Sequence, residues 1–116
     1  NMRHHNTKRK FGRETNQRRA LMKSLAVNLI KNDKIKTTEA KAKELRPFIE
    51  KLVTKAKAGD LAKRRTVISA IGILSTKKLF DKIAPKYKDR NGGYTRITKM
   101  PRRKSDGSKI SVIEFV

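Results

Sequence analysis

The strongest periodicity in the chain lies between Ile35 and Ala58. Apolar side chains recur there at steps of three and four, which places them on one stripe of an α-helix; they are Leu45, Phe48, Ile49, Leu52, Val53 and Ala56. Thr38 can cap the start of this helix, and Gly59 follows its last periodic residue, where a left-handed cap favours glycine. Pro47 interrupts the stripe without shifting its phase. We therefore expect one central helix, kinked at Pro47.

A basic segment precedes the first predicted helix. That helix begins at Glu14 or Thr15, ends near Lys31 and is expected to bury Leu21, Met22, Leu25, Ala26 and Leu29. Residues 1–13 contain five bases, no acid and one large ring, so burial cannot offset their ordering entropy. We interpret them as an extended basic arm that is disordered when free and folds against phosphates. A solvated tail is the alternative.

Two helices are predicted after the central one. Asp60 is a suitable N-cap for a helix from Leu61 to about Ile71, with inward residues Leu61, Val67, Ile68 and Ile71. A short helix then starts at Ser75 or Thr76 and ends before Pro85, and it is expected to bury Leu79, Phe80 and Ile83.

Three segments favour β-structure. Lys34 to Thr37 is short and partly β-branched and leads into the central helix, whereas Tyr94–Met100 and Ile110–Val116 form a hairpin joined by a basic loop that bends at Asp106-Gly107. The predicted order is helix-strand-helix-helix-helix-strand-strand, which is an α+β fold. With 116 residues, we expect one such domain at residues 14–116, preceded by the arm at residues 1–13.

The net charge narrows the choice of partner. Lys and Arg number 32 against 10 Asp and Glu, a formal charge of +22, so a polyanion is the natural partner. Nucleic acid and an anionic membrane surface are the two candidates. The bases crowd loops and the N-terminal arm instead of one face of a continuous amphipathic helix, and no apolar run approaches the roughly 20 residues of a membrane span. This pattern favours nucleic acid.

Catalysis and metal binding have little support. The chain has no cysteine, and its two histidines, His4 and His5, are adjacent in the arm, where they cannot form a preorganised site. No phosphate-cradling glycine loop is present, and Asp106-Gly107 lacks the other ligands of a calcium loop. Thr37-Thr38 is interpreted as capping chemistry and not as a catalytic hydroxyl. We expect no catalytic residue, no metal and no cofactor.

Four regions are candidates for phosphate contact: the arm, the basic faces of the first two helices, Lys63 to Arg65, and the hairpin loop. A fifth candidate is a platform of Arg90, Gly93, Tyr94 and Arg96, in which the glycine backbone approaches a phosphate, the arginine pairs with it and the tyrosine stacks. Tyr94 is equally compatible with a place in the core. The charge-based candidates are Arg3, Lys8, Arg9, Lys10, Arg13, Arg18, Arg19, Lys23, Lys41, Arg64, Arg65, Arg102, Arg103 and Lys104.

Several blocks in this order resemble one family. They are Met2-Arg3-His4, Arg18-Arg19-Ala20-Leu21-Met22, Ile35-Lys36-Thr37-Thr38, Ala40 to Arg46, Gly59-Asp60 with Arg64-Arg65, Lys78-Leu79-Phe80, Gly92 to Arg96, and Ile113 to Val116. Together they closely resemble bacterial large-subunit ribosomal protein seventeen from Met2 to Val116. The sequence differs from the usual pattern of that family at His5, Pro47 and Ser108-Lys109.

The resemblance implies a non-catalytic part of the large ribosomal subunit, with helices packed on a small mixed β-sheet. It implies binding to large-subunit rRNA on the outer surface near the peptide exit tunnel, beside other ribosomal proteins, as a single cytoplasmic copy per ribosome without homo-oligomers or membrane contact. Carried over position by position, the implied RNA contacts are Arg3, His4, Arg18, Arg19, Lys36, Thr37, Lys41, Arg64, Arg65, Arg90, Gly93, Tyr94 and Arg96.

Two other functions compete with this interpretation. A DNA-compacting architectural protein fits the charge equally well, but it would be expected to dimerise, and no heptad seam or second apolar face is evident. A small nuclease needs a carboxylate cluster or a held histidine, and the sequence shows neither.

Overall fold

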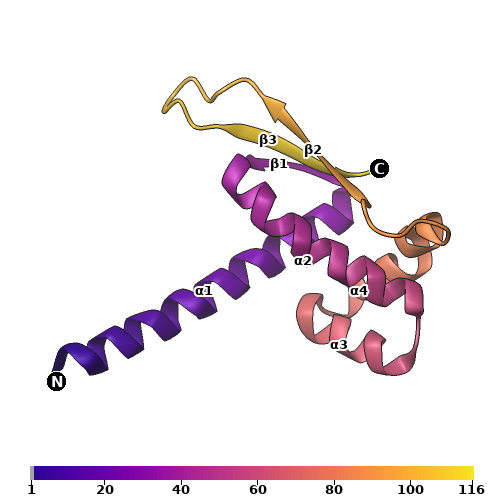
Figure 1. Ribbon diagram of the computed structural model, residues 1–116, viewed down its shortest axis with the longest axis horizontal. Helices are drawn as coiled ribbons and strands as arrows, with labels where there is room; N and C mark the ends of the chain where they lie inside the picture. Colours follow the sequence, from indigo (N-terminus) through magenta and orange to yellow (C-terminus); the bar gives the residue numbers. More distant parts are fainter. Residues whose placement is uncertain (1) are drawn as a thin grey trace.

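The described chain combines helices with one small sheet. The computed structural model describes the backbone of residues 2–116 and the side chains of residues 14–116. Its elements are α1 (Met2–Asn32), β1 (Lys34–Thr38), α2 (Glu39–Ala58), α3 (Leu61–Ile71), α4 (Ile73–Lys78), the π-helical turn η1 (Leu79–Ile83), the 3₁₀ turn η2 (Ala84–Tyr87), β2 (Thr95–Met100) and β3 (Ile110–Phe115). The predicted α+β class is confirmed (Figure 1).

Helix α2 is the centre of the core, as its periodicity predicted. Its buried residues are Ala42, Leu45, Ile49, Leu52, Val53 and Ala56, while Phe48 is half-buried. The Thr38 hydroxyl accepts from the Lys41 amide at 3.4 Å, and Gly59 takes the left-handed φ of 72°. Both predicted caps are therefore confirmed, and α2 runs through Pro47 as a single helix.

The sheet has the order β1-β3-β2, and both pairings are antiparallel. Lys34 and Arg96 flank Glu114, and Ile35 and Ile97 flank Ile113. The sheet thus differs from the mixed sheet that the resemblance implied. The reason is topological: β1 and β2 run in the same direction, but β3 lies between them, so no parallel pair forms.

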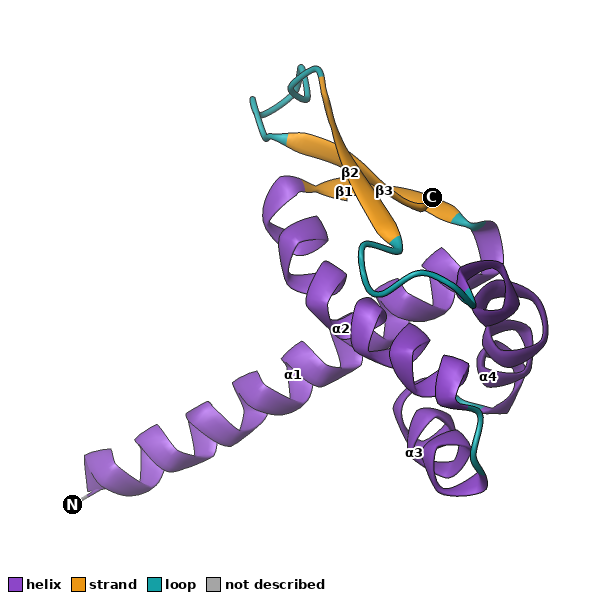
Figure 2. Cartoon of the chain, turned by 45° about the vertical axis from the view of Figure 1, so that its right-hand side comes forward, coloured by secondary structure: helices purple, strands orange, loops and turns teal. Residues whose placement is uncertain are grey.

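The two faces of the sheet have different neighbours. The face that contains Ile35, Ile97 and fully buried Ile113 packs on the helices. Side chains alternate between the faces, so Lys36 and Arg96 belong to the opposite face. In Figures 1 and 2 no helix of the described chain covers that opposite face.

Helix α1 begins at Met2, earlier than the expected start at Glu14 or Thr15. The expected start was taken from the first residues of the apolar stripe. Such a stripe marks the part of a helix that is buried, and it does not show where the helix itself begins. Figures 1 and 2 show the N-terminal half of α1 extending away from the other elements. Thr15 is half-buried, but full burial is reached only at Ala26, Leu29 and Ile30. Leu21 was predicted to be buried and is 37% exposed, because it lies on the part of α1 before the packed segment.

The region after α2 differs from expectation in two details. Leu61 is 63% exposed, although it was predicted to face inward. On a helix it shares its direction with Ile68 and not with buried Val67 and Ile71, and it lies in the first turn. The following helix starts at Ile73, and helical turns continue past Pro85 to Tyr87. A proline is tolerated there because it occupies the first turn of η2.

Candidate nucleic-acid interface

Most of the positive charge in the described part of the chain has no acidic partner. Ion pairs among the described residues involve only Lys43, Lys63, Lys78, Arg96 and Arg103 on the basic side. The pKa of the Glu39 carboxyl is lowered by its hydrogen bond with Lys43. Most of the remaining described bases are available to an external anion, although Lys57 donates to internal acceptors and Arg64 lies against Phe80. Two hollows of the surface bring several of the available bases together.

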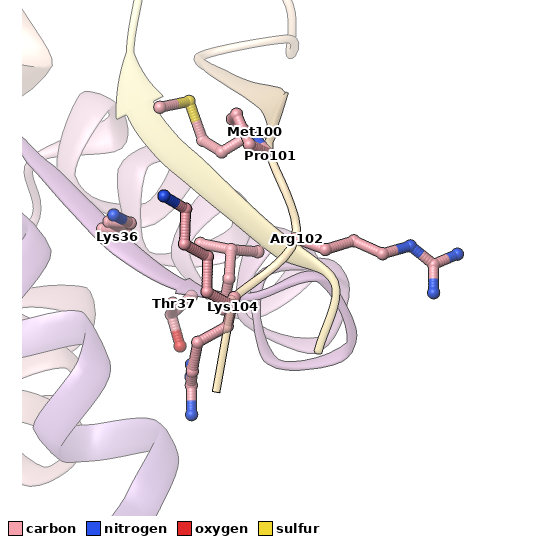
Figure 3. A pocket seen from close by; sticks show the side chains of 8 residues that line it. Lys36, Thr37, Met100, Pro101, Arg102 and Lys104 are labelled. Atoms are coloured by element: carbon pink, nitrogen blue, oxygen red, sulfur yellow. The ribbon is translucent and has the colours of Figure 1, made fainter. Parts of the chain in front are cut away.

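The first hollow lies where the hairpin loop meets the outer sheet face. It is a cavity of about 600 Å³ whose lining joins Lys36 and Thr37 of β1 to residues 100–104 and Ile110. Met100, Pro101 and Ile110 supply the apolar part, and the lining contains no carboxylate. Figure 3 shows Lys104 turned back along the cavity, whereas Arg102 points away from it. The structure thus brings Lys36 and Thr37 together with the predicted basic loop at residues 102–104, from which they were predicted separately.

Internal hydrogen bonds fix the shape of this loop. The Gly107 amide donates to the Arg103 carbonyl at 2.7 Å, and the Arg103 amide donates to the Ser108 carbonyl at 2.9 Å. Asp106 accepts from the Ser108 amide at 3.0 Å and pairs with Arg103 at 3.3 Å. The Ser108 hydrogen bonds and the Arg103 charge lower the pKa of Asp106. The loop therefore holds its basic side chains on an ordered backbone.

The second hollow is a groove of about 740 Å³ between α1, α2 and α3. Arg18, Arg19 and Lys23 of α1 line it, as does Lys51 of α2. The sequence predicted the three α1 residues as individual phosphate contacts, whereas Lys51 was included only as part of the basic face of the central helix. The missed signal is that Lys51 lies one turn after Pro47, on the same side of α2.

The block from Gly93 to Arg96 is built differently from the expected platform. The Glu50 carboxylate accepts from the Gly93 amide at 2.9 Å, the Thr95 amide at 3.0 Å and the Thr95 hydroxyl at 2.8 Å. An internal carboxylate therefore occupies the backbone donors that were predicted to meet a phosphate. Arg96 pairs with Glu114 at 2.8 Å while its side chain stays 61% exposed.

Tyr94 belongs to the core and not to an exposed stacking surface. It is 2% exposed, and its ring centroid lies 5.2 Å from that of Tyr87. Lys57 donates to the Tyr94 hydroxyl at 3.2 Å and to the Arg90 carbonyl. The Thr54 hydroxyl, the Gly92 backbone and the Lys57 ammonium lower the pKa of Tyr94. Of the two interpretations left open by the sequence, the core position is the one that the structure shows.

The other predicted contacts fall into three groups. Lys41, Arg65 and Arg90 are exposed, and Arg90 uses its backbone carbonyl inside the fold. Arg64 is half-buried with its guanidinium 4.9 Å from the centre of the Phe80 ring. The arm residues lie outside the described side chains; they are Arg3, His4, Lys8, Arg9, Lys10 and Arg13.

Neither a metal site nor a membrane-spanning helix is found among the described residues. No group of three or more His, Asp or Glu side chains is placed to hold a metal ion. Among the same residues, no helix has the length and apolar character needed to cross a membrane.

Known proteins resemble this chain over nearly its whole length. The sequence profile of a family described as Ribosomal protein L17 matches residues 21–116. The large ribosomal subunit protein bL17 of Hydrogenobaculum sp. (strain Y04AAS1) is 51% identical over 99% of each chain. The bL17 protein of Clostridium acetobutylicum is 51% identical over 93% of this chain and 96% of its own. That of Sphingopyxis alaskensis is 52% identical over 99% of this chain and 84% of its own.

Proposed function

Because this chain belongs to the Ribosomal protein L17 family, we propose that it is a structural constituent of the large ribosomal subunit and binds the rRNA of that subunit. The family consists of structural proteins and not of enzymes. In this proposal the protein holds the RNA through charge–charge contacts. It neutralises phosphates that folded RNA brings close together, and it carries out no reaction.

The observation that supports this proposal best is the cavity at the hairpin. Four basic residues from β1 and the loop line one hollow without an acid, and the loop backbone is already ordered. An ordered set of cations loses little conformational entropy on binding and releases counterions from the RNA. Arg103 is paired with Asp106, so Lys36, Arg102 and Lys104 carry the uncompensated positive charge of this lining.

Basic residues on other faces of the protein add to the proposed RNA contacts. Arg18, Arg19, Lys23, Lys41 and Arg65 add exposed bases on the helices. We assign the basic arm at residues 1–13 to phosphate contact as well. The proposed place is the outer surface of the subunit near the peptide exit tunnel, beside other ribosomal proteins, as one copy per cytoplasmic ribosome. Contacts spread over many faces suit a protein embedded in folded RNA better than one that reads a single groove.

Sedimentation tests the proposal. A native lysate of the source organism is separated on a sucrose gradient at moderate salt, and this protein is quantified in every fraction. We expect it to sediment with the large subunit at about one copy per particle, and to leave the particle only when rising salt loosens the RNA. Recovery with the chromosome, or among free proteins at the top of the gradient, would reject it.

A further inference from the structure

The groove between α1, α2 and α3 differs in composition from the rest of the basic surface. Met22, Pro47, Phe48 and Ala70 form an apolar floor contributed by all three helices. Phe48 is half-buried, so part of its ring is open to the groove. The other rings with described side chains lie elsewhere: Tyr87 and Tyr94 are buried together, Phe80 is covered by Arg64, and half-buried Phe115 lies on β3, outside this groove. An open ring in a basic hollow is the usual platform for a nucleic-acid base.

Pro47 strengthens this interpretation. A proline inside a helix removes one backbone hydrogen bond and costs roughly 3 kcal/mol relative to alanine. Pro47 is exposed, so the ring gains nothing from burial in the core. It lines the groove next to Phe48, where its apolar ring extends the surface on which a base can rest.

The rim of the groove carries the charge. Arg18, Arg19 and Lys23 line it from α1, and Lys51 lines it from α2. These four cations face one carboxylate, that of Glu44. None of the five takes part in an ion pair within the described chain. The groove is therefore strongly electropositive around an apolar centre, which matches a nucleotide and opposes an apolar peptide.

The Glu44 carboxylate indicates whether the base or the phosphate of a nucleotide lies next to it in the groove. A carboxylate repels a phosphate but accepts a hydrogen bond from the amino or imino N–H of a base. Glu44 is exposed, like the four bases that line the groove. A phosphate next to Glu44 would be repelled, whereas a phosphate next to the arginines and lysines would be bound. The composition thus favours a base on the floor with its phosphates at the rim over contact with the backbone of a duplex.

We propose that this groove holds a single unpaired nucleotide of the large-subunit rRNA, with its base stacked on Phe48 and Pro47 and its flanking phosphates bound by Arg18, Arg19, Lys23 and Lys51. The proposal rests on the assignment of the chain to the large subunit and adds a base-binding site to it. The volume of about 740 Å³ accommodates one nucleotide together with ordered water. An extruded base of this kind would fix the register of the protein on the RNA, which phosphate contacts alone do not.

Photo-crosslinking in assembled large subunits tests the site. Phe48 is replaced by the photoreactive derivative p-benzoylphenylalanine, and as a matched control the same replacement is made at Leu74, which is 85% exposed on α4. We expect the probe at position 48 to crosslink to one unpaired rRNA nucleotide and the probe at position 74 not to reach that nucleotide. A crosslink from position 48 to another protein, or the absence of any crosslink, would overturn the proposal.

A second variant tests the site without the bulky photoreactive side chain, which could alter the groove. Phe48→Leu keeps the apolar floor but removes the aromatic face, so the crosslinked base should become several-fold more reactive toward reagents that modify unpaired bases. Phe115→Leu removes a ring on β3 and should leave that reactivity unchanged. Unchanged reactivity in Phe48→Leu subunits would also overturn the site.

The copy number of the protein per particle is measured in parallel. Absence of the wild-type protein from the large subunit would reject the ribosomal assignment itself, whereas a normal copy number without a base contact would reject the groove alone.

Discussion

Two neighbouring segments of the C-terminal hairpin look alike in sequence but have opposite roles in the structure. Gly92 to Arg96 and Pro101 to Lys104 both combine bases with residues typical of loops. The donors of the first segment are used inside the protein, because the Gly93 and Thr95 amides donate to Glu50 and the Tyr94 hydroxyl donates to the Arg90 carbonyl. The bases of the second segment surround a cavity without a carboxylate.

The difference shows that a motif resembling a phosphate-binding site can have its hydrogen-bond donors occupied by a group of the same protein. A carboxylate offers the same kind of acceptor oxygen as a phosphate, so Glu50 can hold a glycine-rich turn that resembles an anion site. Through these hydrogen bonds, the segment from Gly93 to Thr95 holds the start of β2 against α2. RNA recognition is left to side chains such as Lys36, Arg102 and Lys104, which take part in no ion pair within the described chain. Four predictions test this division, from the largest expected effect to the smallest.

Glu50→Ala should destabilise the folded chain by about 3 kcal/mol, because two backbone amides and one hydroxyl lose a charged acceptor. Urea unfolding of the free protein measures the change. Glu44→Ala is the matched control, since it removes an exposed acid from the same helix and should change stability by no more than about 0.5 kcal/mol. Equal effects of the two substitutions would contradict the structural role of Glu50.

Lys36→Gln combined with Lys104→Gln should weaken binding to large-subunit rRNA about tenfold at physiological salt, while stability stays unchanged. The slope of log affinity on log salt should fall by about 0.7 to 0.9 for each lost phosphate contact. The matched control is Lys82→Gln with Lys86→Gln, which removes the same charge from exposed positions outside the cavity. If both pairs alter the slope equally, the cavity has no special role.

Tyr94→Phe should destabilise the protein by about 1 kcal/mol, because the Lys57 ammonium loses a partner at 3.2 Å in a partly buried place. Thermal unfolding gives the stability change, and a filter-binding assay gives the RNA affinity. We expect the affinity to remain that of the wild type. Unchanged stability together with weaker RNA binding would place the hydroxyl on the RNA and reverse the comparison.

The Asp106 carboxyl should titrate below its usual pKa of 3.8, because the Ser108 hydrogen bonds and Arg103 favour its charged form. A depressed folded-state pKa contributes stability above the unfolded pKa, and this contribution is lost as the pH falls through the folded value. The loop should therefore keep its conformation at neutral pH and loosen only in strong acid. NMR of the Asp106 side chain measures the midpoint, and Ser108→Ala should raise it; a midpoint at or above the usual value would contradict the described loop.

Local sequence signals predicted much of the fold. Thr38, Gly59 and Asp60 mark helix ends where the sequence placed them, and the stripe of α2 is buried as expected. These features depend on neighbours within one or two turns. The start of α1 was not predictable from its pattern, since a helix that buries nothing leaves no apolar stripe.

Contacts between distant residues were harder to predict. Glu50 meets Gly93 and Thr95 across more than forty positions, and nothing near Glu50 indicates that its partner is a backbone turn. The meeting of Lys36 with the loop at Arg102 to Lys104 depends on the strand order β1-β3-β2, which the hydrophobic pattern does not specify. The sequence therefore identified most of the basic candidates but not which of them share a surface.

Lysine reactivity in the free protein and in intact large subunits tests the central claim most directly. Acetylation of each lysine is quantified by mass spectrometry in both states, and again after the subunit RNA is digested. We predict that Lys36 and Lys104 react freely in the isolated protein, are protected in the subunit and regain reactivity after digestion, while Lys57 stays protected throughout by its internal partners. Equal reactivity of Lys36 and Lys104 in the free and assembled states would show that the hairpin cavity does not bind rRNA.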